Sequence, residues 1–279
     1  MTLHRRIACA VAAGCTAWLL AAGPGSTLGE ETGAAAYAKR IAAEPDLVAS
    51  WPLEGTLQPA KGTIVPQAKG GEPQFGEGPG GGKAILLEGG RYLTLGNTPE
   101  LDLRQTTVEL WFRPTFKSGP GYNPCIVAKR GDGDHALTRF SLHIFGDYSC
   151  LAVWNGRAVM QYVVGDGPLV RGQWYHVALT STPDQMRLYV DGVPAVLTGM
   201  AGNFSFDRTG LPLSIGSSQA RGAEILTGSV AGVAIYRRAL SEATVAAHVD
   251  AMGWQARRLN LVGLQKARAE RERKRRAEL

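Results

Sequence analysis

The stretch 172–193, GQWYHVALTSTPDQMRLYVDGV, decides the fold of the chain. Two β-prone runs within it, 174–180 and 186–190, place alternate side chains on opposite faces of a strand. The residues STPDQ between them favour a turn, with a proline that fixes φ and an aspartate that can bond back to the backbone. Asp191 and Gly192 then fit a tight hairpin turn, because such turns need positive φ and glycine tolerates it. The stretch therefore predicts an antiparallel β-meander.

WYHVALTS at 174–181 and RLYVDGV at 187–193 resemble the central hairpin of LamG-like, concanavalin A-like jelly-roll domains, the relatives of laminin G and the pentraxins. Further segments fit that family in the same order: LVASWPLEG at 47–55, KAILLEGGRYLTLG at 83–96, TTVELWFRPTF at 106–116, LPLSIGSS at 211–218 and LTGSVAGVAIYRRALS at 226–241. The resemblance implies an all-β fold, a two-sheet antiparallel β-sandwich. It implies little about function, because this fold hosts lectins, adhesion modules, hydrolases and structural spacers.

The rest of the chain agrees with one jelly-roll domain at 47–254. Short apolar runs alternate with clusters of Gly, Pro, Asn and Asp from 83 to 237, and no segment of helical period lies among them. A sandwich of about 200 residues is an ordinary size for one domain. Short helices are expected at both ends of the domain. One lies in the lead-in at 30–46, and the other follows Ser241, whose hydroxyl can cap it.

Residues 1–29 are expected to be an export signal. A basic start, His4-Arg5-Arg6, precedes an apolar run at 7–22 and then small residues typical of a cleavage site. A membrane anchor is the alternative, but the run is short for a bilayer span of about 20 residues. The sequence therefore predicts an exported protein in the periplasm, at the cell surface or in the medium. Abundant Arg, Ala and Gly suggest a bacterial source.

The last residues, 255–279, are predicted to form a basic helical or frayed extension. Arg and Lys outnumber Glu there, and no apolar stripe continues along it. The chain's net charge of +6 belongs to its two ends, and the body between them is nearly neutral. A solvated tail and a contact with an anionic surface both remain open. Export and the lack of interleaved aromatic residues argue against nucleic acid as a partner.

Two of the four cysteines lie within 1–29, which leaves Cys125 and Cys150 for the exported protein. An oxidising compartment would allow a disulfide between them. If the segment 125–154 forms a three-strand meander, the two cysteines lie on its outer strands, roughly 9–10 Å apart. A disulfide needs Cα atoms about 4.4–6.8 Å apart. A bent entry through 119–124 could close the gap, so the disulfide stays open.

Glycoside hydrolysis is the enzymatic hypothesis that the resemblance suggests. Hydrolases of this fold carry an E-x-D-x-x-E-like strand, whose alternation places two carboxyl groups about 5–5.5 Å apart. The nearest match is ELDLRQ at 100–105, which ends in a glutamine that cannot transfer a proton. Glu109 is a lone acid in the next strand, His176 takes a structural place in the family hairpin, and His143 has no acid beside it in sequence. No catalytic residue is predicted, and the chain is expected not to be an enzyme.

Calcium is the cofactor to consider, because many members of the resembled family bind it. The loop GDGDH at 131–135 offers two carboxylates, whereas a calcium site needs six to eight oxygen ligands. Relatives with a structural calcium often carry acids after the first strand and in the last strand. This chain has TLQP at 56–59 and SVAGV at 229–233 in those places. We therefore expect no cofactor and no tight calcium site.

A binding surface remains, and sugar sites combine aromatic faces with a few hydrogen-bonding groups. The candidates on the expected loops and strand ends are Tyr122, Asn123, Asp132, Asp134, His135, Tyr148, Trp154, Asn155, Arg157 and Tyr162. Neighbouring hairpins could place Tyr148, Trp154 and Tyr162 on one sheet face, although aromatic residues also pack in sandwich cores. The sequence thus predicts an exported, non-catalytic module that recognises carbohydrate or an extracellular protein. A structural role within a cell-envelope assembly is the alternative.

Overall fold

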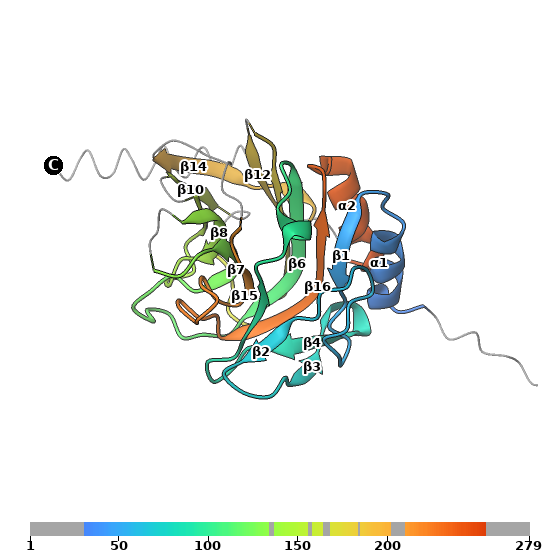
Figure 1. Ribbon diagram of the computed structural model, residues 1–279, viewed down its shortest axis with the longest axis horizontal. Coiled ribbons are helices and arrows are strands. Elements are labelled where there is room, and N and C mark those ends of the chain that lie inside the picture. The colour runs from blue at the N-terminus through green and yellow to red at the C-terminus, as the bar shows by residue number, and fades with distance from the viewer. Residues whose placement is uncertain are drawn as a thin grey trace, which may run out of the picture. The chain divides into compact units, whose positions relative to one another are not determined.

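The computed structural model describes residues 31–133, 137–155, 158–163, 168–183, 185–201 and 210–254. Within these ranges, two eight-stranded antiparallel sheets pack face to face (Figure 1). The prediction of an all-β, two-sheet antiparallel sandwich is therefore confirmed. The predicted signal at 1–29 and the basic extension at 255–279 lie outside the described residues. No helix in the described part of the chain is both long and apolar enough to cross a membrane.

The first sheet, sheet A, has the order β13-β12-β11-β6-β16-β4-β3, and β1 also pairs with β16. Its strands are β1 (Leu47–Trp51), β3 (Phe75–Glu77), β4 (Lys83–Leu86), β6 (Thr106–Pro114), β11 (Tyr175–Ser181), β12 (Met186–Val190), β13 (Val193–Pro194) and β16 (Gly228–Tyr236). Strands β1 and β16, which lie near the two ends of the domain, pair with each other, so these ends meet in one sheet.

The second sheet, sheet B, has the order β14-β10-β9-β8-β7-β15-β5-β2. Its strands are β2 (Gln67–Lys69), β5 (Tyr92–Gly96), β7 (Cys125–Arg130), β8 (Thr138–Ile144), β9 (Leu151–Asn155), β10 (Ala158–Val163), β14 (Val196–Ala201) and β15 (Leu213–Ile215). Strands β7, β8 and β9 form the meander expected from the sequence between 125 and 154.

The predicted hairpin in the stretch 172–193 is formed by β11 and β12, with Val177 opposite Val190. Residues 182–185 connect these two strands, and Asp191 and Gly192 make the next turn, between β12 and β13, with φ of 48° and 82°. The Asp191 carboxylate Oδ1 accepts a hydrogen bond from the backbone N–H of His176 at 2.9 Å. This bond ties the turn to the first strand of the hairpin, so the local sequence and the sheet favour the same conformation.

The main hydrophobic core lies between the sheets and is lined by one face of each. Leu110 on β6 and Val177 on β11 contribute from sheet A, and Leu142 on β8 and Val153 on β9 contribute from sheet B. All four side chains are almost completely buried. Because side chains alternate along a strand, the residues directly before and after each of these four point to the outer face of their sheet.

Two helices form a third layer on the outer face of sheet A. They are α1 (Gly33–Ala42), within the expected lead-in, and α2 (Glu242–Ala251), which Ser241 caps by accepting a hydrogen bond from the Thr244 N–H at 3.2 Å. Figure 1 shows both helices beside β1 and β16. Their apolar side chains and the sheet's outer aromatic residues, Trp111 and Tyr236 among them, form a second hydrophobic cluster. The short 3-10 helices are η1 (Pro79–Gly81) and η2 (Pro99–Leu101).

Candidate functional site

The outer face of sheet B carries a row of small side chains that ends at one large aromatic ring. Ser214 on β15 lies opposite Ala128 on β7, Ala128 lies opposite Ser141 on β8, and Ser141 lies opposite Trp154 on β9. Residues directly opposite each other in antiparallel strands share a face of the sheet. The three small side chains are buried, and Trp154 is half-buried.

His143 stands beside this row and fixes its geometry. Its Nδ1 lies 2.9 Å from the carbonyl oxygen of Asn123, and its Nε2 lies 2.8 Å from the hydroxyl of Ser141. Because a carbonyl oxygen can only accept, Nδ1 carries a proton and donates. The ring centroid lies 5.8 Å from that of Trp154. The imidazole therefore joins β8, β9 and the loop before β7 into one surface.

The loop before β7 brings two of the predicted residues to this surface. Tyr122 is 42% exposed, and its hydroxyl donates to the carbonyl oxygen of Ile225 at 3.1 Å. Asn123 uses its side-chain oxygen to accept from the Gly146 N–H at 3.1 Å. The Asn123 backbone, His143 and Trp154 thus lie next to one another, and Tyr122 precedes Asn123 in the chain.

Asp132 lies at the other end of β7, so the structure does not bring it to Tyr122. Its carboxylate Oδ1 accepts from the Arg221 N–H at 3.3 Å, and the neighbouring Gly133 N–H donates to Gln219 at 3.4 Å. These bonds tie the acidic loop to the loop after β15. Three of the predicted residues, Asp134, His135 and Arg157, lie outside the described residues.

A shared sheet face and packing in the core were both open for Tyr148, Trp154 and Tyr162, and the structure places Tyr148 and Tyr162 in the core. Tyr148 is 6% exposed, stacks on Phe116 with ring centroids 4.3 Å apart, and donates its hydroxyl to the Phe116 carbonyl at 2.6 Å. Tyr162 is 3% exposed and belongs to the core between the sheets. It lies opposite Leu151, a core residue, whereas Trp154 is three positions away and faces outward. Residues that are an odd number of positions apart in a strand point to opposite faces of the sheet.

Burial also removes Asn155 from the candidate surface, because its side chain is almost inaccessible at the end of β9. Burial raises the pKa of Tyr148 to about 12 and raises that of Tyr162 still further. Both phenols are therefore neutral at physiological pH. The sequence pattern did not single out His143, and only its contact with Asn123, distant by 20 positions, reveals its place in the surface.

Cys125 and Cys150 are both buried free thiols in the structure. They lie on either side of β8, at the start of β7 and just before β9, as the meander required. Burial raises the pKa of both thiols, and that of Cys125 most strongly. The possible disulfide stays a question for thiol counting on the unfolded protein.

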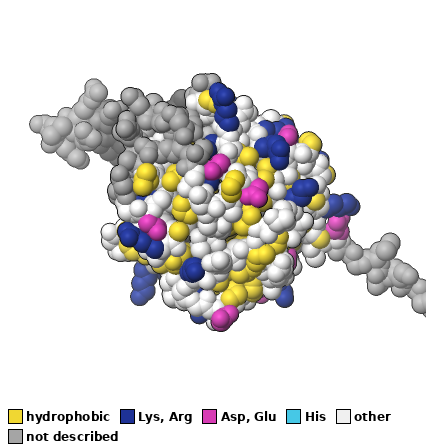
Figure 2. All heavy atoms as spheres, in the orientation of Figure 1, with side chains coloured by type: hydrophobic (Ala, Val, Ile, Leu, Met, Phe, Trp, Pro, Cys, Tyr) yellow, Lys and Arg dark blue, Asp and Glu magenta, His cyan; other side chains and the backbone are white. Residues whose placement is uncertain are grey.

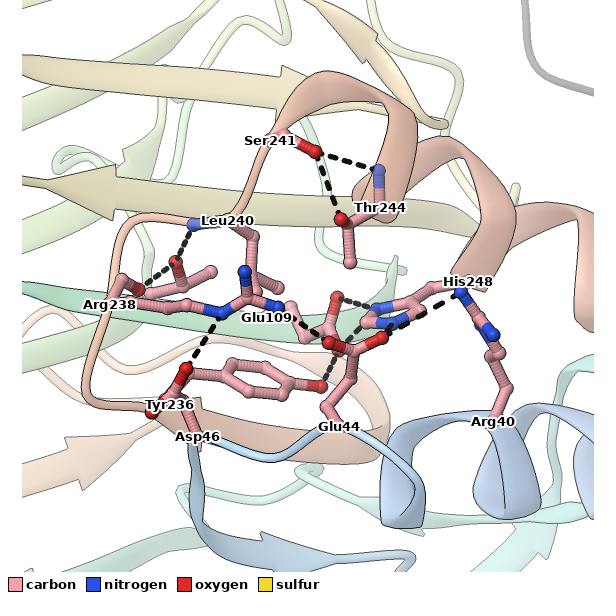
Figure 3. A network of polar contacts seen from close by, with 11 residues as sticks. Arg40, Glu44, Asp46, Glu109, Tyr236, Arg238, Leu240, Ser241, Thr244 and His248 are labelled. Atoms are coloured by element: carbon pink, nitrogen blue, oxygen red, sulfur yellow. Dashed lines mark hydrogen bonds and ion pairs between the residues drawn. The ribbon is translucent and has the colours of Figure 1, made fainter.

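The acids considered for hydrolysis do not reach the outer face of sheet B as a pair. ELDLRQ at 100–105 begins in η2 and precedes β6, so it is not a catalytic strand. Asp102 Oδ1 lies 2.9 Å from Nζ of Lys129. Burial alone would raise the Asp102 pKa, but hydrogen bonds from Lys129 and Gly210 outweigh it and lower the pKa. Glu109 is completely buried beneath α2 on the opposite sheet (Figure 3).

No cluster of three or more His, Cys, Asp or Glu side chains that could hold a metal ion occurs in the described part of the chain. Two members of the acidic loop, Asp134 and His135, lie outside the described residues. The absence of a tight calcium site therefore stays a prediction.

A model of the concanavalin A-like lectin/glucanase superfamily matches residues 87–246. The chain belongs to this superfamily. The superfamily includes binding modules and hydrolases, so membership by itself does not choose between recognition and catalysis. No curated protein matches the sequence.

Two solved structures illustrate the superfamily's range. One is domain 4 of AbnA, a GH43 extracellular arabinanase from Geobacillus stearothermophilus, in complex with arabinotriose; the identity is 18%, the TM-score 0.56, and 73% of this chain and 98% of that chain are covered. The other is Trypanosoma rangeli sialidase in complex with 2,3-difluorosialic acid, with 17% identity, a TM-score of 0.52, and coverage of 74% and 33%. This chain spans about a third of the sialidase. At these identities the likeness shows the fold alone.

Proposed function

We propose that the chain is a non-catalytic module that binds carbohydrate on the outer face of sheet B. The observation that carries the proposal is the group Tyr122, Asn123, His143 and Trp154, with one exposed and one half-buried aromatic ring. A pyranose or furanose ring packs its C–H faces on aromatic rings, and its hydroxyls need hydrogen-bonding groups nearby. Tyr122 and Trp154 would supply the aromatic contacts and Asn123 and the Tyr122 hydroxyl the hydrogen bonds, whereas His143 is 2% exposed and positions its neighbours.

The charge distribution favours an uncharged sugar polymer over an anionic one. Figure 2 shows Lys and Arg side chains scattered among Asp and Glu on the visible face, with no large patch of one sign. The four residues of the group include no carboxylate and no Lys or Arg. Hydrogen bonding and stacking would therefore provide the affinity, and binding should change little with salt concentration.

The non-catalytic part of the proposal rests on the positions of the acids. Glu109 is sealed beneath α2, and Asp102 is held by Lys129. A retaining glycosidase needs two carboxyl groups about 5–5.5 Å apart around the scissile bond. The carbohydrate complex of the arabinanase domain also supports a sugar ligand, since that domain shares this fold over nearly its whole length.

The test is a glycan and polysaccharide array probed with the full-length protein, in the presence of calcium and in the presence of a chelator. We expect binding to one class of neutral polymer under both conditions. Trp154→Ala should weaken this binding about tenfold or more, because one aromatic stacking contact is lost. The matched control is Trp174→Ala, a half-buried tryptophan that contacts Arg113 next to sheet A.

Blank arrays under both conditions would overturn the proposal and favour the protein-interaction alternative. Equal losses from Trp154→Ala and Trp174→Ala would move the binding site away from sheet B. Release of reducing sugar by the wild-type protein would contradict the non-catalytic role.

We also propose that the module acts outside the cytoplasm. The support is the basic, apolar and small-residue order of residues 1–29. Expression in a bacterial host followed by fractionation and intact mass measurement tests it. An exported product that lacks the first 25 or the first 29 residues is expected, because small residues precede both positions in the sequence. A full-length product in the cytoplasm would contradict it.

A further inference from the structure

A cluster of ionisable side chains lies between sheet A and α2, away from the proposed sugar-binding face (Figure 3). Glu109 on β6 is 0% exposed. His248 on α2 places its Nδ1 3.0 and 3.1 Å from the two carboxylate oxygens of Glu109. Tyr236 on β16 donates its hydroxyl to the same carboxylate, and Nε2 of His176 on β11 lies 3.4 Å from it. Four elements therefore converge on one buried carboxylate.

The other nitrogen of His248 faces a second carboxylate. Nε2 lies 3.4 Å from Oε1 of Glu44, which follows α1 in the sequence. Arg238 donates to Oε2 of Glu44 at 2.6 Å, and Arg40 lies 3.7 Å from Oε1. Figure 3 shows the imidazole between the two carboxylates, with Arg238 on the outer side of Glu44. The His248 ring thus connects α2 both to sheet A and to the segment after α1.

Geometry sets the protonation state that suits this arrangement. An ionised carboxylate can only accept hydrogen bonds, so an imidazole placed between two carboxylates is satisfied when both of its nitrogens carry protons. Loss of one proton would leave a nitrogen lone pair facing a carboxylate oxygen. It would also leave the buried Glu109 with a neutral neighbour in place of a cation, and an uncompensated buried charge is strongly destabilising.

We propose that Glu109, His248 and Glu44 form a pH-dependent clamp that holds α2 on sheet A and releases it as the pH rises. In the clamped state His248 is an imidazolium that donates to both carboxylates. In the released state it is neutral, and α2 opens locally while the two sheets remain packed. The hydrophobic contacts of Val245 and Val249 with the sheet hold the helix in part, so release is an increase in opening and not complete unfolding.

The surrounding groups are consistent with this direction. The titratable and charged side chains that face the cluster are Tyr37, Arg40, Glu44, Asp46, Glu109, His176, Tyr236 and Arg238. Burial raises the pKa of Tyr37 and Tyr236, so both phenols stay neutral. Arg40 and Arg238 stay cationic and face Glu44 from the outer side. An imidazole ordinarily gains or loses its charge near neutral pH, so His248 is the group of this clamp whose charge the pH would change.

The pKa shifts define the pH window. Burial alone would lower the pKa of His248, but Glu109 and Glu44 outweigh it and raise the pKa. The contribution of His248 to stability is thus complete below its ordinary pKa of about 6.5 and is lost as the pH rises through the raised value. Burial would raise the pKa of Glu109, but His176 and His248 hold it at about 2. Its contribution is lost only as the pH falls from about 4.3 toward 2.

The test is hydrogen exchange of the full-length protein between about pH 6 and pH 9, with the rates corrected for intrinsic exchange. We expect the protection of α2 amides to fall about tenfold or more over this range, because one pKa unit corresponds to a tenfold change. The amides of β6 and β11 should keep their protection. In His248→Gln, α2 should be less protected at about pH 6 and lose its pH dependence. The matched control is His143→Gln, which replaces a buried histidine on sheet B and should leave the pH dependence of α2 unchanged.

Each of the following results would contradict the proposed clamp. Protection of α2 that does not change with pH, or the same pH dependence in His248→Gln, would show that His248 does not control the helix. An equal loss in all strands would show a global effect in place of local release. Should His248→Gln fail to fold, the imidazole resonances of the wild-type protein decide the matter. A His248 pKa at or below about 6.5 contradicts the proposal.

Discussion

The outer faces of the two sheets hold different side chains at equivalent, outward-pointing positions. On sheet A they are large or ionisable, as with Glu109, Trp111 and His176, and all three are completely buried. On sheet B the small residues Ser141 and Ser214 share that face with the buried imidazole of His143 and the half-buried ring of Trp154. Both faces follow the same alternation of a strand, so the alternation cannot explain the difference.

The layer of helices on sheet A explains why the two outer faces differ. Helices α1 and α2 exclude water from the outer face of sheet A and supply partners for its polar groups, so a buried carboxylate can be satisfied there. On sheet B, His143 bonds to Ser141 and to the loop before β7, the Ser214 hydroxyl makes no hydrogen bond within the described residues, and Trp154 stays half-buried. We therefore expect mutations on the first face to change stability and mutations on the second to change binding.

The largest expected effect on stability comes from replacing one tryptophan on each outer face with alanine. Trp111→Ala removes a fully buried ring that packs on Tyr37 at 5.9 Å and on Trp254 at 5.5 Å, and should lower the free energy of unfolding by about 3–5 kcal/mol. Trp154→Ala removes a half-buried ring and should cost clearly less. Urea denaturation of both variants measures the difference. Equal costs would show that the two faces are buried alike and would break the comparison.

A medium loss of stability is expected from a substitution at Gly232, where α1 packs against sheet A. Its φ is +56°, and a Cβ there would lie 2.8 Å from a ring carbon of Tyr37. Gly232→Ala should therefore lower the free energy of unfolding by about 1–3 kcal/mol more than backbone strain alone. The control is Gly172→Ala, which has φ of +80° but no heavy atom within 4 Å of a new Cβ. Equal losses in thermal or chemical denaturation would argue against tight packing of the third layer.

The smallest expected effect is the difference in stability between two serine-to-alanine variants in the row of small residues on sheet B. Ser141→Ala removes the hydroxyl that contacts His143 and should cost about 1–2 kcal/mol. The Ser214 hydroxyl is buried, and it makes no hydrogen bond within the described residues, so Ser214→Ala should stay within about 0.5 kcal/mol of wild type. Chemical denaturation measures both. A larger loss in Ser214→Ala would reveal a partner of that hydroxyl and would change the picture of this face.

Much of the fold was predictable because its signals are local. The hairpin turn at Asp191 and Gly192, the meander from 125 to 154, and the cap at Ser241 each depend on residues close in sequence. The candidate site was less predictable. Aromatic residues are favoured in both cores and binding faces, and only the register of β9 and β10 separates Trp154 from Tyr162.

The sequence by itself determined the β-sandwich class and the alternation that gives each strand an inner and an outer face. Only the tertiary structure decided which outer face the helices cover and which polar groups meet there. Glu109 and His248 are 139 positions apart, and no local pattern relates them. The physical reason is that backbone conformation depends on neighbours along the chain, whereas burial and charge pairing depend on which distant segments pack together.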